Sequence, residues 1–441
     1  MLNLNTGTWV RKAATAAIAG VLVAVPLAGC QSNATTQSGS DASQATTASD
    51  QSSQEITVTI DDSSCKLSAN ATKSGTVTFH VTNNGTSVNE FEILAEDKLQ
   101  IKTERENITP GTTVDVTAAL EPGTYYTASK TNMVGPLVDA TEFTVEDSGE
   151  EVAVSDDEQE LRNQAVTAYT AYIKDQSGQL LDATTEFAEH YKAGDTAWCK
   201  ENYALVRVHY ERIEPTAEAF GDIDPYLDER RADAGDDGYS TDHVDFEAGD
   251  DLHENGYWTG WHAIELDLWS PDEAGYSDDY RAALADTLVS DTQDLYDLVY
   301  ASSFEVSLDD ISNGAISLLE EVATTKITGE EEAFSHTDLY DFQANVEGAK
   351  VAYGAVRDLV ETKDPDTATE IDKAFVTMND ELSQYNTGDA ENPVYPSYAE
   401  LDANAGEGQD EDSLSDAARK LSNEVNALRE SVAQLTAIVL E

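Results

Sequence analysis

The sequence Gly256-Tyr-Trp-Thr-Gly-Trp-His-Ala-Ile-Glu265 is an apolar, aromatic stretch that contains one histidine and one glutamate. His262 and Glu265 stand three residues apart, and side chains at that spacing lie on one face of a helix. The stretch therefore predicts a helix whose imidazole and carboxylate converge on one cation. The same spacing is typical of a hydrogen-bonded pair in a helical core, so the spacing alone leaves both interpretations open.

Hydrophobic residues recur with a helical period on both sides of this stretch. The expected helices are Leu161–Ala193, Thr196–Phe220, Asp278–Tyr300, Asp309–Thr325, Asp338–Thr362, Asp366–Tyr385 and Ser413–Leu440. Helices joined by short loops predict an all-α bundle, here over residues 158–441. The segment Arg230–Asn255 is rich in Gly and Asp and shows no period, so we expect a loop there.

Before the helices, the sequence alternates apolar and polar residues with a period of two. Such strands are expected at Ile56–Ile60, Gly75–Val81, Phe91–Leu94, Thr113–Val116 and Glu142–Val145. Turn residues such as Pro-Gly separate them. Several short strands at this spacing predict a small β-sandwich over residues 55–147. A chain of 441 residues is also long enough for two folded domains.

The first 29 residues have the pattern of an export signal. A basic start at Arg11 and Lys12 precedes an apolar run from Ala13 to Pro26, and Leu27-Ala-Gly-Cys30 follows. This tetrapeptide resembles the bacterial lipobox, which implies lipidation of Cys30 and anchoring to the outer face of the cytoplasmic membrane. Residues 30–54 are rich in Ser, Thr and Gln and predict a flexible tether.

The chain carries 86 acidic and 25 basic residues, which gives a formal net charge of −61. A surface of this charge repels nucleic acid and anionic lipid headgroups, so neither is expected as a binding partner of the folded part. Cations are concentrated near it. A solvated acidic coat explains most of these residues, and specific cation sites explain the remainder.

The order of lipobox, small β-domain and helical domain resembles the EfeO family of extracytoplasmic iron-uptake components. Members have an N-terminal cupredoxin-like domain and a C-terminal imelysin (M75) domain. The resemblance covers the chain from about Glu55 to its end. It rests on four stretches: Val208-His-Tyr-Glu-Arg-Ile-Glu-Pro215, Gly260-Trp-His-Ala-Ile-Glu265, Leu319–Glu330 and Ser335–Asn345.

This resemblance implies a metal centre in the helical domain, built from a Glu, an Asp and the His-x-x-Glu pair. In this sequence those residues are Glu214, Asp228, His262 and Glu265. One imidazole among three carboxylates suits iron as bound cargo, either Fe²⁺ or Fe³⁺. Cu²⁺ and Zn²⁺ are expected competitors, because both bind most nitrogen and oxygen sites more tightly than Fe²⁺.

The resemblance also implies a second metal site in the β-domain, formed by Cys65, Glu90, Glu92 and Glu104. Where the family can carry another Cys, this sequence has Ala128. A blue-copper site needs a thiolate, two His and usually a Met, and this domain has only His80 and Met133 besides Cys65. A buried thiol without metal is the alternative for Cys65.

The function implied is iron capture and delivery to a membrane permease, with a haem peroxidase of the same system as a further partner. Two other functions stay open: a metallopeptidase, and an adhesion module that uses the β-sandwich. A zinc peptidase needs a second His next to the pair, as in His-x-x-Glu-His. Here Leu266 follows Glu265. We therefore expect a binding protein and not an enzyme.

Overall fold

The structure is a computed structural model that describes residues 54–132, 137–149, 158–235, 238–304, 306–324, 326–389, 392–406, 409 and 413–440. The predicted signal peptide, Cys30, most of the tether and Met133 lie outside the described residues. Within the described residues, no helix combines the length and apolar character that crossing a membrane requires.

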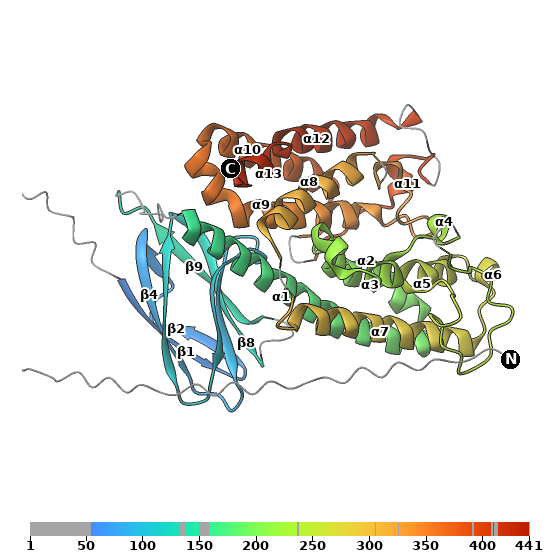
Figure 1. The fold of residues 1–441 in the computed structure, drawn as a ribbon, viewed down its shortest axis with the longest axis horizontal. Coiled ribbons are helices and arrows are strands. Elements are labelled where there is room, and N and C mark those ends of the chain that lie inside the picture. The colour runs from blue at the N-terminus through green and yellow to red at the C-terminus, as the bar shows by residue number, and fades with distance from the viewer. Residues whose placement is uncertain are drawn as a thin grey trace, which may run out of the picture. The chain divides into compact units, whose positions relative to one another are not determined.

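The first folded part is a sandwich of two sheets with strand orders β2-β1-β4-β7 and β3-β9-β8-β5-β6 (Figure 1). The strands are β1 (Gln54–Asp61), β2 (Ser64–Leu67), β3 (Ala71–Lys73), β4 (Gly75–Asn83), β5 (Asn89–Leu94), β6 (Ile101–Ile108), β7 (Thr113–Leu120), β8 (Gly123–Thr131) and β9 (Val138–Glu146). Alternate residues such as Val58, Phe79 and Phe91 fill the core between the sheets.

Strand β5 is buried along its whole length because both of its faces are covered. Phe91 and Ile93 point into the core between the sheets. Glu90 and Glu92 alternate with them and therefore lie on the opposite face. Residues of the first helix contact that face, since Ala171 packs with Leu94 in a separate apolar cluster.

The second part is helical, which confirms the predicted fold class of a β-sandwich followed by an α-bundle (Figure 1). Its elements are α1 (Glu158–Lys192), α2 (Thr196–Glu211), η1 (Glu214–Phe220), α3 (Ile223–Asp228), α4 (Arg231–Ala234), α5 (Gly260–Trp269), α6 (Pro271–Ala274), α7 (Asp278–Tyr300), α8 (Leu308–Thr324), η2 (Lys326–Thr328), α9 (Asp338–Lys363), α10 (Pro365–Ser383), α11 (Tyr398–Leu401), α12 (Asp416–Val432) and α13 (Leu435–Leu440). Helix α1 packs on α7 and α2, and α8 packs on α9.

Two predicted helices are each divided in the structure. The expected helix Thr196–Phe220 ends at Glu211, and the 3₁₀ helix η1 starts at Glu214 with Pro215 near its beginning. Proline has no backbone N–H to continue an α-helix and fits at the start of a new helix. The expected helix Ser413–Leu440 is likewise divided into α12 and α13.

Candidate metal centre

Helix α5 carries His262 and is fixed at its start to the end of α3, which carries Asp228. Gly260 has a φ of +82°, and a Cβ atom there would lie 2.2 Å from the carbonyl oxygen of Leu227. Only glycine tolerates both conditions. The hydroxyl of Thr259 donates to the carbonyl of Tyr226 at 3.0 Å. The backbone itself therefore sets the spacing between the two helices.

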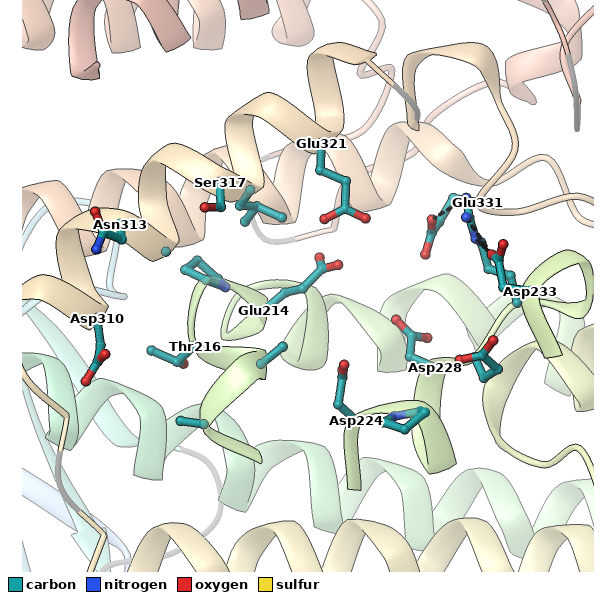
Figure 2. Close-up of a pocket in the computed structure, with 18 residues that line it drawn as sticks. Glu214, Thr216, Asp224, Asp228, Asp233, Asp310, Asn313, Ser317, Glu321 and Glu331 are labelled. Carbon is teal, nitrogen blue, oxygen red and sulfur yellow. Dashed lines mark hydrogen bonds and ion pairs between the residues drawn. The ribbon is translucent and has the colours of Figure 1, made fainter. Parts of the chain in front are cut away.

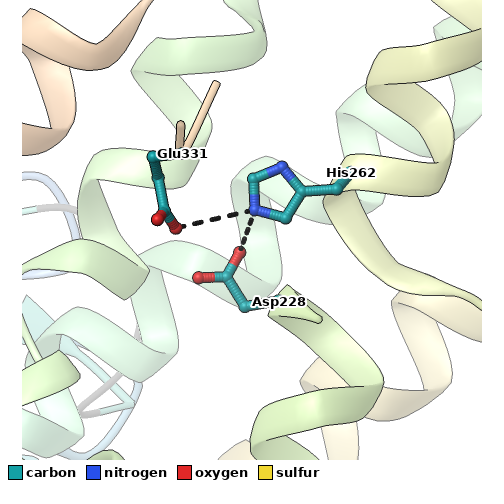
Figure 3. A group of neighbouring side chains, drawn as sticks. All are labelled: Asp228, His262 and Glu331. Atoms are coloured by element: carbon teal, nitrogen blue, oxygen red, sulfur yellow. Dashed lines mark ion pairs between the residues drawn. The ribbon is translucent and has the colours of Figure 1, made fainter. Parts of the chain in front are cut away.

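This arrangement brings Asp228 and Glu331 to one nitrogen of His262 (Figure 3). The Nε2 atom of His262 lies 3.5 Å from an Asp228 oxygen and 3.7 Å from a Glu331 oxygen. The ligand atoms of these three residues all lie within 4.8 Å of one another. His262 is only 2% exposed, and Nε2 has no hydrogen-bond partner among the described residues. A metal ion would satisfy this buried nitrogen.

The other nitrogen of His262 faces Glu265, with 3.4 Å between Nδ1 and Oε2. The second oxygen of Glu265 accepts backbone N–H bonds from Phe334 at 2.9 Å and Ser335 at 2.6 Å. An immobilised carboxylate at Nδ1 keeps a proton on that nitrogen, so Nε2 is the nitrogen that would give up its proton and bind a metal. Glu265 is not in the three-residue group with Asp228 and Glu331, but it forms a second buried group of candidate ligands with His262 and Glu332.

The charges around His262 favour its cationic form in the absence of metal. Burial and the Arg207 guanidinium both lower the pKa of His262. Contacts with the neighbouring carboxylates raise it more, and the result is a pKa of about 10. Burial raises the pKa of Glu331, but Lys326 and His262 outweigh burial and hold that pKa well below its usual range. The centre therefore attracts positive charge strongly.

Arg207 of α2 is fully buried beside the centre and is surrounded by carboxylates. It is paired with Asp228 and Glu211, and its Nε atom lies 2.8 Å from an oxygen of Glu332. Acidic side chains outnumber the basic ones in this buried region, which holds Glu211, Asp228, Glu265, Glu331, Glu332, Asp338 and Asp341 against Arg207, Lys326 and His262. Excess buried negative charge is costly unless protons or a bound cation neutralise it.

The centre opens onto an acidic pocket of about 760 Å³. Asp228 and Glu331 belong both to the centre and to the wall of this pocket. Glu214 and Glu321 point toward each other from η1 and α8 (Figure 2). An ion in the pocket therefore reaches two candidate ligands of the centre directly, and it is surrounded by carboxylates before it does.

The structure brings together three of the four residues expected for this centre, namely Asp228, His262 and Glu265. Glu214 lies in the same pocket, but its carboxylate is bound by Lys326 at 2.7 and 2.8 Å. Glu331 takes the position beside Nε2 that sequence reasoning left unassigned. Its signal in the sequence is the run of three glutamates at 330–332 just after Gly329.

Known families match both parts of the chain. The model of imelysin, peptidase M75, matches residues 165–435, and the model of the cupredoxin-like domain matches residues 22–138. A protein of Escherichia coli O157:H7 named iron uptake system component EfeO is 33% identical over 378 residues, which cover 85% of this chain and 88% of the relative. The chain belongs to the EfeO family. Proteins of the same name from Escherichia coli K12 and Shigella flexneri are each 32% identical, with the same coverage of both chains.

In the cupredoxin-like domain of this EfeO family member, Glu90, Glu92 and Glu104 form a further group of candidate ligands. Strand register explains it, because Glu104 of β6 lies opposite Glu92 of β5 and Glu90 lies two residues away on the same face. Burial, and then the charge of Glu92, raise the pKa of Glu90 to about 10. Lys130 already supplies a cation there, with Nζ 3.2 Å from Glu92, and it also pairs with Asp175 of α1.

Cys65 does not join these glutamates, although the family resemblance implied that it would. It is 2% exposed in the apolar core between the two sheets, where Phe91 also lies. Glu90 and Glu92 point to the other face of β5, because they alternate with Phe91 along the strand. Burial raises the pKa of the Cys65 thiol to about 12, so the thiolate that would bind a metal is disfavoured.

Proposed function

We propose that this protein captures iron outside the cytoplasm as the binding component of an iron-uptake system. The observation that carries the proposal is the buried Nε2 atom of His262, which has no hydrogen bond among the described residues and lies 3.5 Å and 3.7 Å from carboxylate oxygens of Asp228 and Glu331. The name of its relatives, iron uptake system component, supports iron as the cargo. The permease and haem peroxidase of such a system are the proposed partners.

The donor set agrees with iron on chemical grounds. One imidazole nitrogen and two carboxylates make a mixed nitrogen and oxygen site, which suits iron and also admits zinc and copper. Glu265 orients the imidazole through Nδ1, as carboxylates commonly do for metal-binding histidines. The acidic pocket raises the local concentration of cations. Selectivity among metals then depends on geometry and on which metals are available.

The experiment is a metal titration of the purified chain with Fe(II) under nitrogen, Fe(III), Cu(II) and Zn(II). We expect tight iron binding that is lost in the His262→Ala variant. His80→Ala is the control. That histidine lies on β4 of the β-sandwich, pairs with Asp115 and contacts no residue of the metal centre among the interactions described. Equal and weak binding by wild type and His262→Ala would mean that the acidic surface merely collects cations.

We propose that Cys30 is lipidated and holds the protein at the outer face of the cytoplasmic membrane. The support is the lipobox-like Leu27-Ala-Gly-Cys30 after an apolar run. Mass spectrometry of the membrane fraction would detect the lipid on Cys30. A Cys30→Ser variant should leave the membrane fraction, and its retention there would contradict the proposal.

Peptidase activity is the competing function, because the matching family model carries a peptidase name. Two observations favour binding over hydrolysis. Leu266 stands where a second zinc-binding His would follow Glu265. Both oxygens of Glu265 are also engaged, so it is poorly placed to act as a general base on water. Cleavage of a peptide mixture by the zinc-loaded protein, absent in His262→Ala, would restore the peptidase hypothesis.

A second cation site at Glu90, Glu92 and Glu104 is also proposed, without Cys65. Its three carboxylates are close together and buried or half-buried. All-oxygen donors suit hard cations such as Fe(III). Weak metal binding that remains in His262→Ala after the tight binding is lost, and that disappears on adding Glu90→Gln, would support this site. If no metal remains bound in His262→Ala, the second site is not occupied.

A further inference from the structure

Lys326 is a fully buried lysine that contacts Glu214 and Glu331, two residues in the wall of the acidic pocket. It begins η2, between α8 and the segment that carries Glu331. Its Nζ atom lies 2.7 and 2.8 Å from the two oxygens of Glu214 and 3.3 Å from an oxygen of Glu211. The nearest oxygen of Glu331 is 3.8 Å away. One ammonium therefore separates Glu214 from a candidate ligand of the metal centre.

Glu214 is close to the centre but engaged elsewhere. It lines the same pocket as Asp228 and Glu331. Besides Lys326, it accepts a hydrogen bond from the side-chain amide of Asn345 at 2.7 Å. Its side chain is 13% exposed, so its carboxylate has access to the pocket, whereas that of Glu211 is fully buried. Of the two carboxylates hydrogen-bonded to Lys326, Glu214 is the one able to turn toward an ion in the pocket.

We propose that Lys326 is an exchange cation for Glu214. In the metal-free protein the ammonium holds Glu214. A metal ion bound by Asp228, His262 and Glu331 takes Glu214 from the ammonium as a further ligand. Lys326 stays paired with Glu211 throughout, and its ion pair with Glu214 forms again when the metal dissociates. This inference rests on the metal centre proposed above.

The exchange has a physical consequence for cargo release. A ligand that must be withdrawn from an ion pair contributes less to metal affinity than a ligand that is free. Lys326 therefore weakens binding, which suits a protein that must pass its cargo on. Removing the ammonium should free Glu214 for the metal and tighten binding.

The test is a double-mutant cycle on Co(II) and Fe(II) affinity with wild type, Lys326→Met, Glu214→Gln and the double variant. We expect Lys326→Met to bind about tenfold more tightly, and this gain to vanish when Glu214 is replaced by Gln. Lys192→Met removes the same charge from an exposed pair with Asp286 and should leave affinity unchanged. A gain of equal size with and without Glu214 would overturn the exchange.

A second measurement covers the case in which Lys326→Met does not fold, since it removes the ammonium that Glu211 and Glu214 share. The visible absorption of bound Co(II) reports its ligands. Glu214→Gln should alter that spectrum and weaken binding, and an unchanged spectrum would overturn the proposal. If Co(II) binds His262→Ala as tightly as wild type, the metal centre itself is wrong. If only the cycle or the Glu214→Gln spectrum fails, the centre stands and Lys326 is a fixed counter-ion.

Discussion

The Oε2 atom of Glu265 lies 3.4 Å from Nδ1 of His262, and the same carboxylate is held by two backbone N–H groups of the segment that carries Glu331. Glu265 thus links the orientation of the imidazole to the position of a candidate ligand 66 residues further along the chain. The first prediction concerns this link.

Replacing Glu265 with Gln should weaken metal binding by about 10- to 100-fold, because a neutral amide no longer fixes the proton on Nδ1. Helical content by circular dichroism should stay close to wild type. Glu370→Gln, on the exposed face of α10, is the matched control and should bind normally. Undiminished binding by Glu265→Gln would show that the carboxylate does not orient His262.

Glu331 is predicted to be a direct ligand. Glu331→Gln should weaken metal binding by at least about tenfold, since it removes a charged donor next to Nε2. Its neighbour Glu330 provides the control, because that carboxylate pairs with Arg230 at 2.6 Å instead. Isothermal titration calorimetry would measure the metal affinity of Glu331→Gln and Glu330→Gln. An equal loss of affinity in the two variants would contradict a specific role for Glu331.

Gly260 should not accept a side chain. Gly260→Ala places a Cβ against the carbonyl of Leu227 and forces a φ of +82° on alanine, so we expect a loss of about 2–4 kcal/mol in unfolding free energy. Gly235→Ala is the control, with a φ of −70° and nothing near the added carbon. Thermal unfolding of the two variants should differ by several degrees, and similar melting would argue against the close contact.

His209 should make the protein less stable in acid. Burial, and then the charge of Arg212, lower the pKa of His209 to about 3, whereas the unfolded chain has the ordinary value of about 6.5. Between these values the unfolded state binds the extra proton, so stability falls as pH drops, by up to about 1.4 kcal/mol per pH unit.

Urea unfolding at pH 7, 5.5 and 4.5 would measure this effect. His209→Gln keeps a donor for Gln176, which lies 3.1 Å from the His209 ring nitrogen, and cannot be charged. Its stability should therefore fall less steeply with acid than that of wild type. Carboxylates elsewhere affect both proteins alike. Parallel stability curves would mean that His209 is not buried in its neutral form.

Lys130 should be essential to the fold of the cupredoxin-like domain. It is 1% exposed between Glu92 and Asp175, and its loss leaves two carboxylates without their cation. Lys130→Met should cost about 3–5 kcal/mol in unfolding free energy. Lys66→Met, an exposed lysine on β2, should change stability by less than about 0.5 kcal/mol. Chemical denaturation of both variants gives the comparison.

Local patterns in the sequence predicted much of the fold. The helix expected at Asp278–Tyr300 has those bounds in the structure, because its apolar residues keep one period from end to end. Four strands escaped prediction: β2 and β3, which are only four and three residues long, and β6 and β8. β6 reads Lys-Thr-Glu-Arg-Glu in its middle, and β8 buries polar residues such as Ser129 and Lys130 because both of its faces are covered. Neither strand alternates apolar with polar residues.

The candidate site was predictable only where its residues are neighbours in sequence. His262 and Glu265 follow from helical spacing, and Asp228 came from the family resemblance. Glu331 lies in an irregular segment before α9 and reaches His262 only through tertiary contacts. The engagement of Glu214 by Lys326 is equally invisible in the sequence, since 112 residues separate the two.

The acidic pocket affects how fast a metal ion is captured, whereas the buried centre determines how tightly it is held. Its carboxylates attract a cation through solvent, and dissolved salt shortens the reach of that attraction from about 10 Å at 0.1 M to about 3 Å at 1 M. His262 and Glu331, which are 2% and 5% exposed, are shielded from such screening. In strong brine the protein would therefore collect metal more slowly, yet hold each captured ion for nearly as long.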